Sequence, residues 1–151
     1  MSKFLGIDLA SVSATAEHEL GLRVQNAEGN KTYVYVKSDA TGVAVNKTVS
    51  IADGFVVTSG AANAAVFGVA QVALGASEYG FVQVQGVVTA AIADTTAAGT
   101  LLSLLSAASG KFTAVVAVAE GGATTHILGA QSVRAQSMTV EAADIASVLL
   151  F

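Results

Sequence analysis

Apolar and polar residues alternate along several short stretches of this chain. In KTYVYVK (31–37), the valines fall on one side of an extended backbone and the tyrosines on the other. A period of two residues predicts a half-buried β-strand. The stretch AEGN (27–30) before it consists of turn-forming residues, and LGLRVQ (20–25) before that is the expected hairpin partner.

Further strands are predicted about every ten residues, with glycine at the joints. They fall at 43–51, 55–58, 65–74, 79–88, 111–119, 125–133 and 136–141. In the fourth of these, Val82 and Val84 face one way, and Gln83 and Gln85 face the other. We expect the glutamines on a face that meets water or a polar interface. Regular short strands of this kind favour a β-sandwich or a small barrel.

Two stretches leave the secondary structure open. TLLSLLSAAS (100–109) and VEAADIASVLL (140–150) are each compatible with a short helix or with a strand. The predicted fold class is therefore all-β, with at most one or two short helices.

A run of 24 residues, 54–77, carries no charge and is long enough to cross a bilayer as a helix. Polar residues dilute it, and its three internal glycines would each cost a helix about 1 kcal/mol relative to alanine. Flanking Lys/Arg clusters and aromatic belts are missing from the sequence around it. We interpret residues 67–86 as two apolar strands joined by the turn GASE (75–78), and we expect no membrane partner.

Charged residues make up only 12% of the chain, against about 25% in ordinary soluble domains. So little charge leaves wide neutral surface, which is typical of proteins that contact other proteins. The net charge is −4, and the seven Lys and Arg residues are scattered, so a nucleic-acid partner is not expected. The chain has no cysteine, which excludes disulfides and thiolate metal sites.

The sequence offers little catalytic chemistry. A phosphate-binding loop would need glycine where Leu105 stands and Ser or Thr where Phe112 stands. The two histidines, His18 and His126, lack metal-ligand spacing and are interpreted as ordinary surface or strand residues. The aspartates mostly sit at turns, where they accept backbone N–H bonds. We expect no enzyme, no cofactor, no metal and no catalytic residue.

The middle of the chain resembles the head-decoration (cement) proteins of tailed bacteriophages. The shared features are a GVAQ step at 68–71, an EYG turn before a Val/Gln strand at 78–80, AAG at 97–99 and SG at 109–110. The ending ILGAQSV…ASVLLF is also similar, so the resemblance covers roughly residues 60–151.

This resemblance implies a β-sandwich, jelly-roll or small barrel-like domain of the β-tulip type, assembled as a homotrimer. It implies a virion protein on the outer surface of the capsid head that clamps neighbouring major capsid subunits. One alternative is another virion component, such as a tail-tube, fibre or shell protein. A second is a cellular binding module or small enzyme.

We divide the chain into an N-terminal arm or extension (1–19) and a single β-rich decoration domain (20–151). Phe4, Leu5 and Ile7 form an apolar trio outside the strand pattern. Because chain termini are usually disordered unless they are tied down, this trio is a candidate for docking on the capsid. Packing of the trio in the domain's own core is an equally open alternative.

Overall fold

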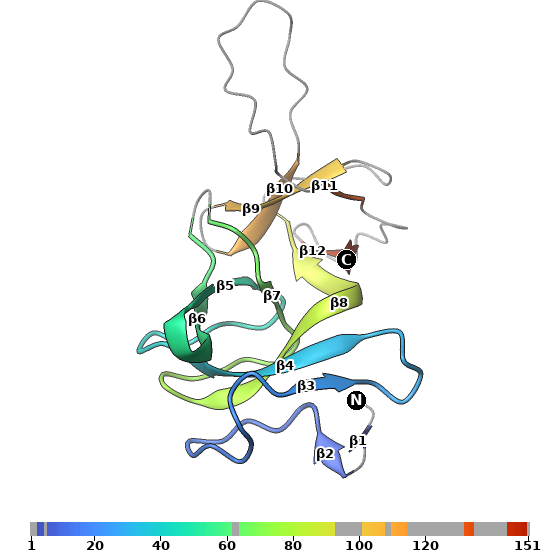
Figure 1. The fold of residues 1–151 in the computed structure, drawn as a ribbon. Helices are drawn as coiled ribbons and strands as arrows, with labels where there is room; N and C mark the ends of the chain where they lie inside the picture. Colours follow the sequence, from blue (N-terminus) through green and yellow to red (C-terminus); the bar gives the residue numbers. More distant parts are fainter. Residues whose placement is uncertain are drawn as a thin grey trace, which may run out of the picture.

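A computed structural model describes residues 3–4, 6–61, 64–92, 101–107, 110–114, 132–134 and 145–150, with side chains for 6–61, 64–92 and 110–112. The fold is all-β, as predicted (Figure 1). The strands are β1 (Lys3–Phe4), β2 (Ile7–Asp8), β3 (Arg23–Gln25), β4 (Thr32–Ser38), β5 (Thr48–Ala52), β6 (Val56–Ser59), β7 (Gly68–Ala70), β8 (Tyr79–Ala91), β9 (Leu101–Ala107), β10 (Lys111–Ala114), β11 (Ser132–Arg134) and β12 (Ile145–Leu150). A 3₁₀ turn, η1 (Asp53–Phe55), joins β5 to β6.

Five of these strands close into a barrel. Antiparallel pairs link β4 to β8, β8 to β7, β7 to β5 and β5 to β6, and a parallel pair between β6 and β4 completes the circle. Strand β3 extends the barrel wall beside β4, and β12 extends it beside the second half of β8. A separate sheet has the order β10-β9-β11. Of the two predicted architectures, the structure has the small barrel.

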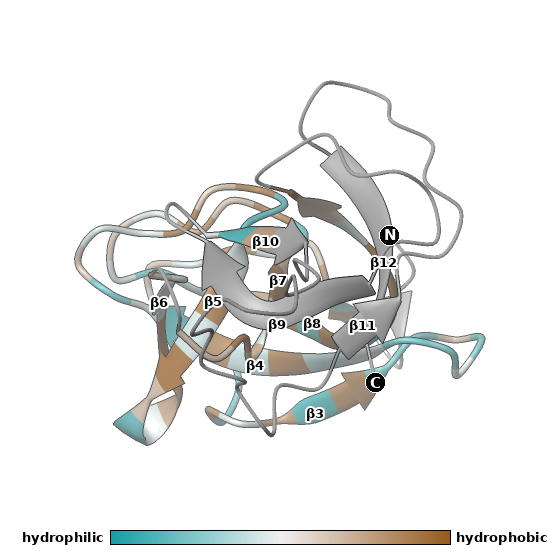
Figure 2. Ribbon diagram, turned by 90° about the horizontal axis from the view of Figure 1, so that it is seen from above, coloured by the Kyte–Doolittle hydropathy of each residue, from teal (hydrophilic) through white to brown (hydrophobic). Residues whose placement is uncertain are grey.

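The interior of the barrel is filled mainly by valine. The alternating valines of β4 point inward, and single residues from each of the other four strands meet them. Figure 2 shows the hydrophobic residues of β4 as brown segments of the ribbon. The full cluster is Val34, Val36, Val43, Val49, Val57, Ala70, Leu74 and Val82. Branched side chains of this size fill the interior of a small barrel, so the interior is a packed core.

A second cluster covers the outer face of β4 and β8. It consists of Leu9, Val24, Tyr33, Tyr35 and Phe81, with Ile7, Leu20, Leu22 and Tyr79 packed at its margin. The alternation in β4 predicted one buried face, but Tyr35 is only 2% exposed, so both faces are buried. The reason is that the N-terminal segment folds back over the tyrosines.

One of the two glutamines of β8 differs from the expectation of a face that meets water or a polar interface. Gln85 is exposed, but Gln83 is completely buried, at 0% exposure. The pairing with β4 shifts by one residue here, from Tyr33↔Gln83 to Thr32↔Gln85. Such a β-bulge bends the strand and re-aims its side chains. The buried amide of Gln83 then donates to backbone carbonyls of its own strand.

Both stretches left open between helix and strand contain strands, β9 in 100–109 and β12 in 140–150. The apolar run 65–74 contains only the three-residue β7. The predicted strand 136–141 and residues 115–119 and 125–131 of two others lie outside the described residues. Among the residues described, none forms a helix of the length and apolarity that a bilayer crossing requires.

Candidate interaction surface

Two of the three residues proposed as a docking arm, Phe4 and Ile7, lie in a short hairpin. Phe4 in β1 pairs with Ile7 in β2, and Leu5 between them lies outside the described residues. Ile7 is half-buried and packs against the outer aromatic cluster. The side chain of Ile7 thus contacts the domain itself, and the described side chains do not include Phe4 or Leu5.

The segment that follows this hairpin lies on the barrel. Leu9 is buried in the outer cluster, and Ser13 exchanges two backbone hydrogen bonds with Tyr79, at 3.0 and 2.8 Å. The backbone N–H of Glu17 donates to the hydroxyl of Tyr35 at 3.0 Å. His18 stands edge-on to the Tyr35 ring, with centroids 5.1 Å apart, so it is an aromatic packing residue here. His126 lies outside the described residues.

A groove of about 580 Å³ runs beside β3. Its apolar lining comes from Ile7, Leu22 and Val24, and its polar lining comes from Arg23, Gln25, Thr32 and Gln85. Residues alternate across a strand, so the groove receives side chains from both faces of β3. The apolar side chains therefore lie on one face of β3, and the polar side chains lie on the other face.

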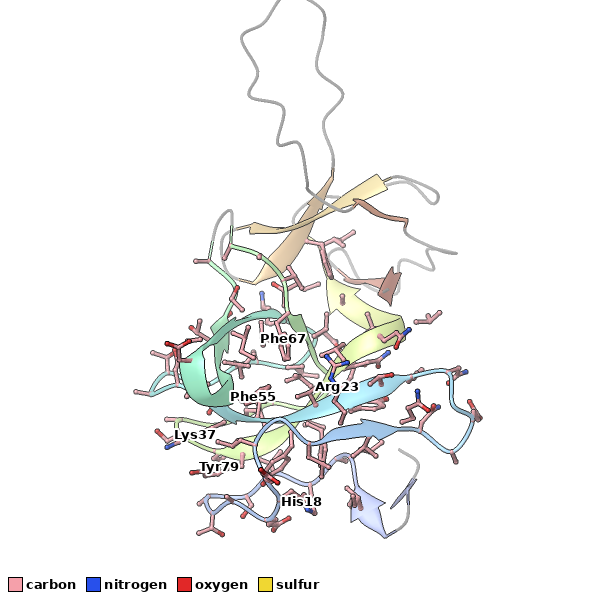
Figure 3. All side chains as sticks on the ribbon, viewed as in Figure 1. His18, Arg23, Lys37, Phe55, Phe67 and Tyr79 are labelled. Carbon is pink, nitrogen blue, oxygen red and sulfur yellow. The ribbon has the colours of Figure 1, made fainter. Side chains whose placement is uncertain are left out.

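A second hollow of about 330 Å³ shares Arg23 and Gln85 with the groove and adds Val66, Phe67 and Val84. Figure 3 shows Arg23 on β3 with Phe67 above it. Arg23 is exposed, and no salt bridge involves it within the part of the chain that the structure describes. A guanidinium group in this position offers several hydrogen-bond donors to a ligand or partner.

A different stretch of the chain carries almost no charge. We call residues 44–77 the neutral segment, because Lys47 and Asp53 are its only charged residues. It carries three of the large apolar side chains that are exposed, namely Val45, Ile51 and Phe55. A hollow of about 490 Å³ is lined by residues from its beginning, middle and end, including Ala44, Ser59 and Ala73. This surface suits contact with another protein.

Asp39 is the carboxylate with the most hydrogen bonds described. One of its oxygens accepts the backbone N–H and the hydroxyl of Thr41, at 2.9 and 2.7 Å, and the N–H of Gly42 at 3.0 Å. Burial alone would raise the pKa of Asp39, but these bonds and one from Thr58 outweigh it and lower the pKa. The carboxylate thereby stabilises the turn that leads to Val43, whose backbone pairs with Leu74.

Among the residues described, no three His, Cys, Asp or Glu side chains lie close enough together to hold a metal ion.

The sequence pattern predicted a strand over 20–25 but did not single out Arg23 and Gln25 as surface residues of interest. The signal was present, because these two polar residues alternate with Leu22 and Val24 in the predicted strand.

Comparison of the chain with protein-family models, with curated proteins and with solved structures found no match. The fold defines the chain as a small closed β-barrel protein.

Proposed function

We propose that this protein decorates the head of a tailed bacteriophage, binding the outer surface of the capsid and clamping neighbouring major capsid subunits. The motifs that resemble decoration proteins support this proposal. GVAQ (68–71) includes all of β7, and EYG (78–80) opens β8. The resemblance implied a barrel-like all-β domain, and the fold agrees with that implication.

The observation that carries the proposal is the neutral segment. Three large apolar side chains stand exposed on a stretch of chain with one positive and one negative charge. Fully burying a side chain of this kind contributes about 1.5–3 kcal/mol, and these three, which are 39–50% exposed, would gain roughly half of that. A partner that covers them gains this energy without having to desolvate many charges.

Clamping requires binding and no chemistry. A protein that binds the assembled shell, and not the separated subunits, stabilises the shell by mass action. At a free concentration of 100 times the dissociation constant, each occupied site adds about 2.7 kcal/mol. Many copies on one head would add this energy at every site. The resemblance also implies a homotrimer, and we include self-association in the proposal.

The first test is the copy number of the chain in purified particles of its source. A number near that of the major capsid protein, together with weaker heads after the chain is stripped off, is the expected result. A few copies per particle would indicate a tail or fibre protein instead. Absence from particles would overturn the proposal and favour a cellular role.

A second test uses two matched valine and isoleucine sites. Ile51 in the neutral segment is 40% exposed, and Val87 in β8 is 43% exposed. We expect Ile51→Ser to weaken rebinding to stripped heads about tenfold, in line with 1–3 kcal/mol for an interface side chain. Val87→Ser should leave rebinding unchanged, and equal effects of both substitutions would contradict a role for the neutral segment.

A further inference from the structure

Among the strands that the structure describes, β3 has one unpaired edge. It is the last strand in its sheet and pairs only with β4 in the part of the chain described. Leu22 accepts the N–H of Tyr35 at 2.9 Å, and Asn26 donates to the carbonyl of Lys31 at 3.0 Å. Because bonding direction alternates along an antiparallel strand, residues 22, 24 and 26 bond towards β4. The N–H and C=O groups of Arg23 and Gln25 therefore point away from the barrel.

Open strand edges pair with other strands unless something blocks them. The chain has no proline that could block this edge, and β3 pairs with β4 without a register shift. The groove of about 580 Å³ is lined by residues 22–25 of this strand segment and, from its paired side, by Thr32 and Gln85. The one obstacle is Arg23, whose charge disfavours any partner that places a second cation opposite it.

We propose that β3 pairs antiparallel with β3 of a second copy of this chain, across a two-fold axis at Val24. Arg23 then lies opposite Gln25 of the second copy, Val24 opposite Val24, and Gln25 opposite Arg23. Two-fold contacts of this kind use the same surface patch on both copies. The contact joins copies in pairs, and within the proposed decoration function it would connect one trimer to the next.

The backbone selects this register. Two copies can form backbone hydrogen bonds only where residues whose N–H and C=O groups point away from β4 lie opposite each other. Within β3, the two-fold axis can therefore fall only at Arg23, Val24 or Gln25. An axis at Arg23 sets two arginines face to face and brings in Gly21, whose φ of 86° is not that of a strand. An axis at Gln25 runs into the turn that begins after Asn26. An axis at Val24 alone pairs both outward residues and forms four backbone hydrogen bonds.

The side chains agree with the same register. Arg23 and Gln25 lie on the polar side of the groove, where the guanidinium of one copy can donate to the amide oxygen of the other. Val24 lies on the side lined by Ile7 and Leu22 and is only 5% exposed, so the two valines would lie side by side beneath apolar side chains of their own copies. In this register, each polar residue of one copy lies opposite a polar residue of the other copy, and Val24 lies opposite Val24.

The test introduces cysteine into a chain that has none. In Val24→Cys, the two sulfur-bearing residues form a non-hydrogen-bonded pair with Cα atoms about 4.5 Å apart, which suits a disulfide. In the control Gln25→Cys, the two Cα atoms are about 8 Å apart, beyond disulfide range. Under mild oxidation in solution, we expect Val24→Cys to form covalent dimers at least tenfold faster than Gln25→Cys. Equal rates, or no dimer from a folded Val24→Cys protein, would overturn the proposal.

A second variant covers the case in which Val24→Cys does not fold, since Val24 is buried. Gln25→Pro removes an outward N–H that β4 does not use, so the barrel should remain intact. We expect its self-association, followed by analytical ultracentrifugation, to weaken at least tenfold relative to the unaltered chain. Unchanged association would contradict pairing through β3.

These outcomes are separate from those of the decoration proposal. Pairing of β3 is measured on free protein, whereas decoration is measured by copy number on particles. High copy number without β3 cross-links would leave decoration standing and overturn the pairing. Cross-links from Val24→Cys to a capsid subunit, without links between copies, would also overturn it and assign the edge to the capsid.

Discussion

The side-chain amide of Gln83 donates to the carbonyl of Val87, four residues further along the same strand, at 2.9 Å. It also donates to the carbonyl of Gln85 at 3.0 Å. One buried side chain thus spans the β-bulge, on the side where β8 leaves β4 and goes on to pair with β12. The bend in β8 is therefore held by a hydrogen-bonded side chain as well as by backbone pairing.

Replacing Gln83 with leucine should lower the free energy of unfolding by about 1–3 kcal/mol, because two hydrogen bonds are lost while the volume is nearly kept. Gln83→Glu should cost more at neutral pH, since a carboxylate cannot donate to two carbonyls. Urea unfolding at pH 7 and pH 4 would measure both. The glutamate variant should recover stability at the lower pH, and a flat response would contradict this role.

Gly86 lies just past the bulge and has a φ of 93°. A Cβ at this position would overlap the carbonyl oxygen of Asn30. Gly29 has a similar φ of 70°, but a Cβ there would meet nothing within 4 Å. We expect Gly29→Ala to cost about 1 kcal/mol for its left-handed backbone. Gly86→Ala should cost at least about twice as much, as measured by thermal unfolding, and similar costs would show that space at Gly86 is unimportant.

Asp39 should make stability depend on acid. Its pKa is lowered in the folded state, because the hydrogen bonds from Thr41, Thr58 and Gly42 outweigh the effect of burial. The stabilisation is therefore complete above the ordinary pKa of 3.8 and is lost as the pH falls through the lower folded-state value. Asp39→Asn should be less stable than the unaltered chain at pH 7, and the gap should narrow below pH 3.8. A gap that is constant from pH 7 to pH 2.5 would refute this assignment.

Tyr35 attaches the N-terminal segment to the barrel through its hydroxyl, which accepts the N–H of Glu17. Tyr35→Phe keeps the ring contacts with His18 and Phe81 and removes only this bond. We expect a loss of about 1 kcal/mol and faster amide exchange near Glu17, with little change in the barrel strands. Hydrogen-exchange mass spectrometry would show this, and uniform acceleration across the barrel would contradict a local role.

Much of the strand pattern could be predicted because it depends on neighbours in sequence. The alternation in 31–37 and the turn at 27–30 correspond to β4 and its connection from β3. The connection at 75–78 likewise joins the apolar run containing β7 to β8. Local residue types determine such features, because turns and period-two alternation involve only a few consecutive residues.

The departures depend on contacts between distant residues. Tyr33 and Tyr35 are buried because residues 6–22 fold over them, and alternation within β4 cannot reveal that cover. Gln83 is buried beside a bulge, and the bulge appears only in the pairing with β4. The role proposed for Arg23 and Gln25 depends on β3 being the last strand of its sheet, which is a property of topology.

Strand β8 pairs with both β4 and β7, and its position has a consequence for synthesis of the chain. Until residues 79–85 have left the ribosome, β4 and β7 have no strand to connect them, and the barrel cannot close. While the nascent chain ends at residue 78, the valines of β4 and β5 are not fully enclosed, because β8 is still missing. Contacts between such distant segments form slowly, and exposed strand edges invite aggregation. Translation through β8 is therefore the step after which the growing polypeptide can first close the barrel and cover its apolar side chains and strand edges.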